Sequence, residues 1–182
     1  MKVLLISDIH GSSYYAKKIE EIVNREEPNK IIVLGDLYYH GPRNPLTQEY
    51  NPLEVAKILN SLKDRLEVIK GNCDAEVDEM ISEFQFNKNL LEEINGKKIF
   101  FTHGHIYNID NLPKEDFDIM CYGHFHTHFI KQEQGKIFVN PGSISLPKEN
   151  TKHSYAIITE EEIQIKDVEG NLVESLKYKD IM

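Results

Sequence analysis

Seven side chains with nitrogen or oxygen ligand atoms each lie just beyond the end of a short apolar run of this sequence. They are Asp8, His10, Asp36, Asn72, His103, His124 and His126. Residues i and i+2 of an extended segment face the same way, so the spacings Asp-x-His and His-x-His each allow two side chains to bind one ion together. Seven such groups at one place would be crowded and electrostatically unfavourable without cations. The pattern therefore predicts a centre with two divalent metal ions.

The apolar runs themselves have the length and composition of buried β-strands. The runs at residues 3–6, 31–34, 66–69 and 99–101 are nearly continuous and rich in β-branched or aromatic side chains, as in α/β proteins whose strands are covered on both faces. Further strands are predicted at residues 119–122, 137–139, 155–158, 163–168 and 172–176. Ligands of open α/β sheets bind beyond the carboxyl ends of the strands, where the first four candidate segments lie.

Helices are predicted between the early strands. Ser12 or Ser13 can cap a helix that ends near Arg25. Residues 51–54, Asn-Pro-Leu-Glu, combine a capping residue, a proline in the first turn and a glutamate three places after the cap. A third, shorter helix is expected after Asp74. The alternation of strands and helices, followed by a strand-dense C-terminal third, predicts a mixed sheet system with helices outside.

The stretch from residue 37 to residue 50 has no periodicity and contains two prolines and three tyrosines. Loops of this length in compact domains are usually functional or disordered. Because it begins one residue after the candidate ligand Asp36, we expect it to form a wall of the substrate site.

Composition bounds the class of protein. With 182 residues, 40% of them hydrophobic and 28% charged, the chain is expected to form one domain over residues 1–182. A net charge of −9 argues against stable, sequence-independent binding to nucleic acid. No apolar run is long enough for a membrane span, and the first one is too short for a signal peptide. The spacing of Cys73 and Cys121 does not suggest a disulfide framework, and the cytoplasm is the expected location.

Five short motifs together resemble the signature of the calcineurin-like metallophosphoesterases. They are Asp8-x-His10, Gly35-Asp36, Gly71-Asn72-Cys73-Asp74, Thr102-His103-Gly104-His105 and Gly123-His124-x-His126. Residues 39–44 and 140–143 are similar to the small bacterial YfcE-type phosphodiesterases in particular, and the resemblance covers nearly the whole chain. It implies an α/β fold of four layers, α-β-β-α, with two mixed sheets packed face to face and helices outside.

The resemblance also implies a metal-dependent phosphodiesterase that acts on a small phosphodiester, by attack of a hydroxide bridging two divalent metal ions. One ion would be held by Asp8, His10, Asp36 and His126, and the other by Asp36, Asn72, His103 and His124. A donor set of nitrogen and oxygen without thiolate suits Mn²⁺, Fe, Zn²⁺ or Ni²⁺, and the resemblance favours Mn²⁺. A homodimer or homotetramer is a further expectation from the resemblance.

Cys73 departs from the pattern of many superfamily members, which have histidine directly after the asparagine ligand. A neutral thiol, with an ordinary pKa near 8.5, gives little help to an alkoxide leaving group. The YfcE-type branch has the same replacement. We therefore expect diesters with good leaving groups to be better substrates than alkyl phosphate monoesters.

Asp36 and Asn72 are expected to act in catalysis, and three further residues are candidates for contact with the substrate. Arg43 could donate to a phosphate oxygen, His40 could act as a leaving-group acid, and His105 could face the site because it lies two residues after His103. Two other functions use the same centre: a phosphomonoesterase and a cyclic-nucleotide phosphodiesterase. A third, from another class, is a metal-binding scaffold for protein interactions, as in a eukaryotic trafficking subunit of this fold.

Overall fold

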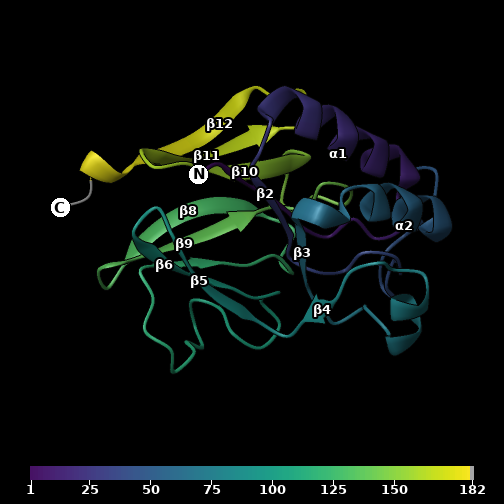
Figure 1. The fold of residues 1–182 in the computed structure, drawn as a ribbon, viewed down its shortest axis with the longest axis horizontal. Helices are drawn as coiled ribbons and strands as arrows, with labels where there is room; N and C mark the ends of the chain where they lie inside the picture. Colours follow the sequence, from purple (N-terminus) through teal and green to yellow (C-terminus); the bar gives the residue numbers. More distant parts are fainter. Residues whose placement is uncertain (181–182) are drawn as a thin grey trace.

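A computed structural model describes residues 1–180 and contains two packed β-sheets (Figure 1). The first sheet has seven strands in the order β12-β11-β10-β1-β2-β3-β4, of which β1 to β4 are parallel and the other three antiparallel. Their bounds are Val3–Ile6 (β1), Lys30–Val33 (β2), Leu66–Ile69 (β3), Phe86–Asn87 (β4), Ser154–Ile158 (β10), Glu162–Asp167 (β11) and Leu172–Lys177 (β12).

The second sheet has five strands in the order β5-β6-β7-β9-β8. The inner strands β6, β7 and β9 are parallel, and the edge strands β5 and β8 run antiparallel to their neighbours. Their bounds are Leu90–Ile94 (β5), Lys97–Phe101 (β6), Ile119–Cys121 (β7), His128–Glu133 (β8) and Lys136–Pro141 (β9). Both sheets are therefore mixed, as predicted, whereas β4, β5 and β8 are strands that the sequence pattern did not indicate.

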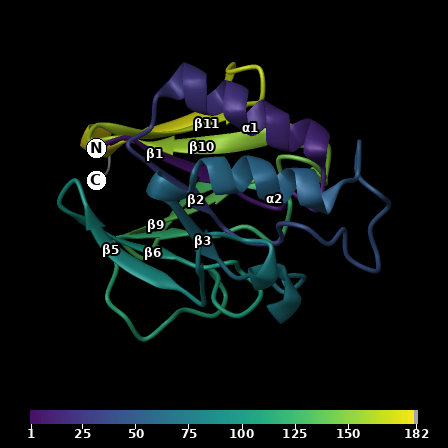
Figure 2. The ribbon, with the colours of Figure 1, turned by 45° about the vertical axis from the view of Figure 1, so that its right-hand side comes forward.

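Two α-helices, α1 (Ser13–Glu26) and α2 (Pro52–Ser61), cover the outer face of the seven-stranded sheet (Figure 2). Both begin at predicted caps: the Ser12 side chain accepts a hydrogen bond from the Tyr15 amide, and the Asn51 side chain accepts one from the Glu54 amide. The predicted third helix after Asp74 is a 3₁₀ helix, η2 (Glu76–Met80); two further 3₁₀ helices, η1 and η3, span Lys63–Arg65 and Tyr178–Asp180.

Three apolar clusters separate the layers. One lies between the two α-helices and the first sheet, and a second lies between the two sheets. The third packs Phe100, Phe117, Met120, Tyr122 and Phe138 on the outer face of the second sheet. The partly buried Tyr107 and Ile109 cover this cluster, so a loop between β6 and β7, rather than an α-helix, closes this side within residues 1–180.

The segments that follow the parallel strands come together at one edge of the sheets. After β1 and β2, the amides of Asp8 and His10 donate to the carbonyls of Gly35 and Asp36, at 3.1 and 2.9 Å. After β6 and β7, the Gly123 amide donates to the His103 carbonyl at 2.9 Å. This backbone pairing brings the predicted ligand segments to one place.

Glycine is required where these segments touch. A Cβ atom on Gly71 would lie 2.1 Å from Oδ1 of Asp36, and one on Gly123 would lie 1.8 Å from Oγ of Ser7. Both separations are far inside van der Waals contact, so a larger residue would push the segments apart. No helix among residues 1–180 is long and apolar enough to cross a membrane.

Candidate metal centre

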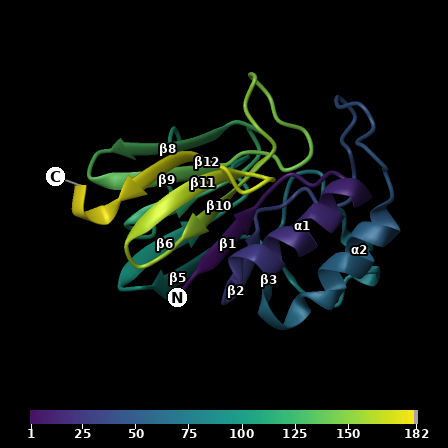
Figure 3. The ribbon, with the colours of Figure 1, turned by 90° about the horizontal axis from the view of Figure 1, so that it is seen from above.

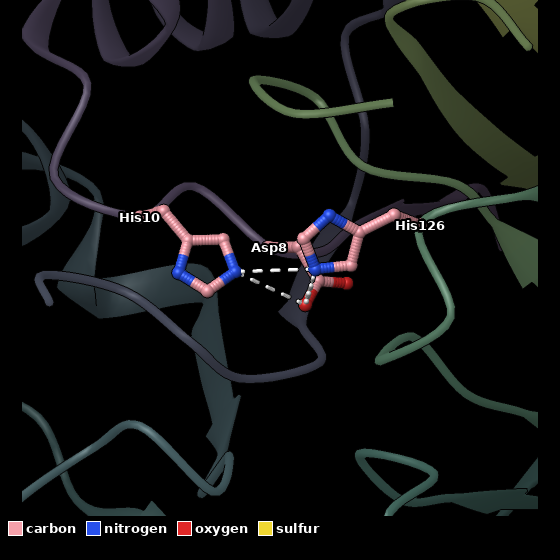
Figure 4. A group of neighbouring side chains, drawn as sticks. All are labelled: Asp8, His10 and His126. Carbon is pink, nitrogen blue, oxygen red and sulfur yellow. Dashed lines mark hydrogen bonds and ion pairs between the residues drawn. The ribbon is translucent and has the colours of Figure 1, made fainter. Parts of the chain in front are cut away.

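Asp8, His10 and His126 meet at the end of β1, with their side chains pointing toward one another (Figure 4). Nε2 of His126 lies 3.3 Å from Oδ1 of Asp8 and 3.2 Å from Nε2 of His10. All three residues are buried, with at most 2% of their surface exposed. The structure thus brings together side chains that are more than a hundred positions apart in the sequence.

A second group of ligand atoms adjoins the first and shares Asp36 with it. Nε2 of His103 lies 3.4 Å from Oδ2 of Asp36 and 3.1 Å from Oδ1 of Asn72. Nε2 of His10 is 3.6 Å from the same Asp36 oxygen. Asp36 therefore stands between the histidine of one group and the histidine of the other, which is the position expected of a bridging ligand.

His124 completes the arrangement through its backbone as well as its ring. Its amide donates to Oδ2 of Asp8 at 3.0 Å, and the centre of its ring lies 5.1 Å from that of His103. The side chain lines the same cavity as His10 and His126. All seven predicted ligands are therefore at one site.

Three of the histidines are oriented by backbone carbonyls. Nδ1 of His10, His103 and His126 lies 2.6–2.8 Å from the carbonyl oxygens of Tyr39, Leu34 and Leu146, respectively. A carbonyl can only accept, so Nδ1 carries the proton in each ring and Nε2 of the neutral form presents a lone pair to the centre. Metal-binding histidines are commonly fixed in this way through their second nitrogen.

This arrangement fits metal ions and is unfavourable without a positive charge. In the neutral rings, the lone pairs on Nε2 of His10 and His126 face each other across 3.2 Å. Oδ1 of Asp8, which is buried beside them, has no hydrogen-bond partner within residues 1–180. Buried polar atoms are normally satisfied, and a cation among these acceptors would satisfy all of them.

The ionisation of the cluster reflects the same electrostatics. Burial opposes charge on His103, but the carboxylates of Asp36 and Asp8 outweigh it and raise the pKa of His103 to about 9. Burial likewise opposes charge on Asp8, yet the neighbouring histidines hold the pKa of Asp8 well below its usual range. Burial and the charge on His103 lower the pKa of His124 to about 4.

Without metal ions, stability should therefore fall as the pH rises. The pKa of His103 is raised from 6.5 to about 9, so the stability that its proton contributes is complete below pH 6.5 and is lost as the pH approaches 9. Linkage sets the loss at about 3 kcal/mol at most. Urea unfolding of chelator-treated protein at pH 6.5 and pH 9 measures this change. In His103→Gln the difference should shrink; an unchanged difference would contradict the assignment.

The backbone at these ligands is unusual. Asp8, His10, Asp36, His124 and His126 all have φ between +48° and +67°. This left-handed region is uncommon for residues other than glycine, and such conformations concentrate at functional sites. The segments are not extended at these positions, so turns, and not the pleated strands that the i, i+2 argument assumed, aim the side chains inward. Asp8 and His10 do lie in one group, with Nε2 of His10 3.7 Å from Oδ1 of Asp8, whereas His124 adjoins His103 and His126 adjoins Asp8.

Asp74 holds two of the ligand segments together. Its buried carboxylate accepts hydrogen bonds from the amides of Asp36, Leu37 and Gly71 at 2.7–2.8 Å. Burial, with the nearby Asp36 carboxylate, raises the pKa of Asp74 to about 6. On the other side, the hydroxyls of Ser143 and Ser145 donate to the Asp8 carbonyl. These contacts fix the backbone that carries the candidate ligands.

A cavity of about 700 Å³ opens over the centre. Its wall includes residues of the segment 37–50, among them Arg43, and the half-buried Cys73. His40 and His105 do not line it. The His40 ring packs edge-on against Tyr39 and Tyr50, with centroids 4.8 and 5.4 Å away, and the exposed His105 packs beside His103, with centroids 5.3 Å apart.

Lys148 also lines the cavity, although nothing in the sequence pattern had indicated it. It follows β9 in a polar loop, Lys-Glu-Asn-Thr-Lys, and a lysine in such a loop is usually only a solvated surface residue. Only the tertiary structure places Lys148 near the candidate ligands, because its amide donates to the carbonyl of His126 at 3.0 Å.

Comparison with known proteins agrees with this geometry. The calcineurin-like phosphoesterase superfamily domain matches residues 1–162. Phosphodiesterase YfcE of Escherichia coli is 36% identical, over 91% of each chain, and its solved structure superposes with a TM-score of 0.93, covering 97% of this chain and 99% of that one. A probable metallophosphoesterase of Bacillus subtilis, YsnB, is 31% identical over 98% of each chain.

A more distant likeness concerns the fold alone. Vps29 of Chaetomium thermophilum is 17% identical and has a TM-score of 0.68, with 98% of each chain covered. The matches to the superfamily domain and to YfcE, over most of the chain, establish descent as well as architecture. The chain belongs to the calcineurin-like phosphoesterase superfamily.

Proposed function

We propose that this protein is a metal-dependent phosphodiesterase that hydrolyses small phosphodiesters with good leaving groups. The observation that carries the proposal is the convergence of the inward-facing Nε2 atoms of His10, His103 and His126 with two buried carboxylates below an open cavity of about 700 Å³. The relatives named phosphodiesterase and probable metallophosphoesterase support the same reaction class, phosphoric ester hydrolysis.

The seven candidate residues divide into two overlapping ligand sets. The first consists of Asp8, His10, Asp36 and His126; the second consists of Asp36, Asn72, His103 and His124. Two divalent ions held by these residues, Mn²⁺ by family resemblance, would supply an activated water and charge stabilisation for in-line displacement. The short Nε2–oxygen distances around Asp36 support its assignment as the shared ligand.

The chain's own groups favour diesters over alkyl monoesters. Cys73 lines the cavity, and burial, followed by the nearby Asp36 carboxylate, raises its pKa to about 12, so the thiol is neutral and a poor acid. His40 and His105 lie outside the cavity wall, and their proposed catalytic parts stay predictions. A substrate whose leaving group departs without a proton suits such a site.

Arg43, exposed at the cavity, is the residue proposed to bind a phosphate oxygen.

Hydrolysis of a panel of phosphates tests the proposal. Protein reconstituted with Mn²⁺, Zn²⁺, Ni²⁺ or Fe²⁺ should hydrolyse bis(4-nitrophenyl) phosphate faster than 4-nitrophenyl phosphate, an alkyl monoester or a cyclic nucleotide, and a chelator should stop the reaction. Preference for a monoester or a cyclic nucleotide would favour those alternatives instead. Folded, metal-loaded protein without activity on any member would contradict an enzymatic role and favour the scaffold.

A further inference from the structure

Two cationic side chains line the cavity from separate loops. Arg43 comes from the segment after β2, and Lys148 comes from the loop between β9 and β10. These two loops protrude on the same side of the molecule in Figure 3. Both residues are exposed, whereas the candidate ligands His10 and Asp36 are buried. The cations therefore lie farther out than the metal centre, toward solvent.

Neither cation has an ion-pair or side-chain hydrogen-bond partner within residues 1–180. Some lysines of this acidic chain are paired, as Lys30 is with Glu92 at 2.5 Å and Lys166 with Glu26 at 3.0 Å. Others, such as Lys88 and Lys114, have no such partner within residues 1–180, so what distinguishes Arg43 and Lys148 is that both line the cavity over the candidate metal centre. The acids that line the same cavity are Asp36, in the candidate metal centre, and Asp74, which accepts three backbone amides.

The loop that carries Lys148 is anchored to the metal centre. The amide of Lys148 donates to the His126 carbonyl at 3.0 Å, and the Thr151 hydroxyl donates to the Lys148 carbonyl at 2.7 Å. The next residue, Glu149, lines a different pocket, on the side of Phe125 and Phe129, so it does not neutralise Lys148 at the cavity. These hydrogen bonds fix the backbone of Lys148 relative to the candidate ligands.

We propose that Arg43 and Lys148 form a subsite for a second phosphate group, so that preferred substrates are phosphodiesters with a terminal phosphate on one arm. This inference rests on the proposed function, because the metal centre takes the scissile phosphate, and it assigns the phosphate oxygen that Arg43 binds to the second phosphate. A guanidinium presents a planar fork of donors and an ammonium a compact charge, and both bind phosphate oxygens. Tyr39 and Pro42 line the same cavity and give the organic part between the phosphates an apolar surface.

Two substrates that differ only in this group test the inference. They are thymidine 5′-(4-nitrophenyl phosphate), with and without a 3′-phosphate. In both, water adds to phosphorus, the P–O bond to the aryl group breaks and 4-nitrophenolate leaves, so the chemistry is the same. The wild-type protein loaded with Mn²⁺ should have a kcat/KM about tenfold higher for the 3′-phosphorylated substrate, mainly through KM, as expected for charge-assisted contacts at an exposed site.

Lys148→Gln should reduce this ratio to about twofold while leaving the substrate without the 3′-phosphate unchanged, and Lys148→Glu should bring it to one or below. Lys177→Gln, which makes the same charge change at the end of β12, is the matched control and should keep the wild-type ratio. The advantage should also weaken with added salt.

Equal kcat/KM for the two substrates in the wild-type protein would overturn the subsite and leave the diesterase intact. An equal loss on both substrates in Lys148→Gln would overturn it too, because Lys148 would then act on the scissile phosphate. Absence of hydrolysis of either substrate by metal-loaded protein would instead overturn the proposed function.

Discussion

Asp36→Asn is expected to lower phosphodiester hydrolysis by more than about 100-fold, because changes in groups that merely support metal ligands already cost 10- to 100-fold. Asp36 belongs to both proposed ligand sets. Its Oδ2 lies 3.4 Å from Nε2 of His103 and 3.6 Å from Nε2 of His10. An amide has nearly the same shape but no charge, so it weakens the binding of both ions together. The fold should persist, because Asp74 still accepts its three backbone amides.

The measurement combines activity with a metal count. Elemental analysis of reconstituted wild-type protein should give two ions per chain, and Asp36→Asn should give fewer. His103→Ala should behave similarly, because His103 is one of four ligands proposed for its ion. Asp64→Asn, on an exposed 3₁₀ turn, is the matched control. If Asp36→Asn kept more than a tenth of the wild-type rate at saturating metal, the ligand assignment would be wrong.

Cys73→His is expected to raise activity on an alkyl phosphate monoester by at least about tenfold, which is part of the 10²–10⁴-fold that a well-placed general acid contributes. Cys73 lines the cavity close to the candidate ligands. Its Sγ lies within 4.8 Å of a ring nitrogen of His10 and of a carboxylate oxygen of Asp36. A protonated imidazole there can donate to the leaving oxygen. The thiol cannot do so effectively, because its pKa is raised to about 12.

An aryl diester provides the internal comparison, since a nitrophenolate leaves without a proton and should respond much less. The kcat/KM of both substrates is measured for wild type and variant at equal metal content, with Cys73→Ser as a control for the loss of sulfur alone. Only part of the full gain is expected, because the surroundings of residue 73 fit a thiol. Equal changes on the two substrates would exclude proton donation at this position as the source of the preference.

Much of the architecture was predictable from local sequence. The four early apolar runs are strands β1, β2, β3 and β6, and both α-helices begin where capping residues indicated. These features depend on burial and on contacts within a few residues, which local pattern records. Strands β5 and β8 were missed because they are edge strands with exposed or charged residues, Leu-Leu-Glu-Glu-Ile and His-Phe-Ile-Lys-Gln-Glu. Their pairing depends on distant partners.

The sequence by itself determined which residues could form the centre, because only some side chains offer nitrogen or oxygen donors and their spacing after strands is visible in one dimension. Only the tertiary structure decided how they act. The protonated nitrogens of His10, His103 and His126 are set by carbonyls 20 to 69 positions away, and the left-handed turns at the ligands are held by Asp74, Ser143 and Ser145. Such contacts exist only once the chain has folded, and the same is true of the placement of Lys148 beside the cavity.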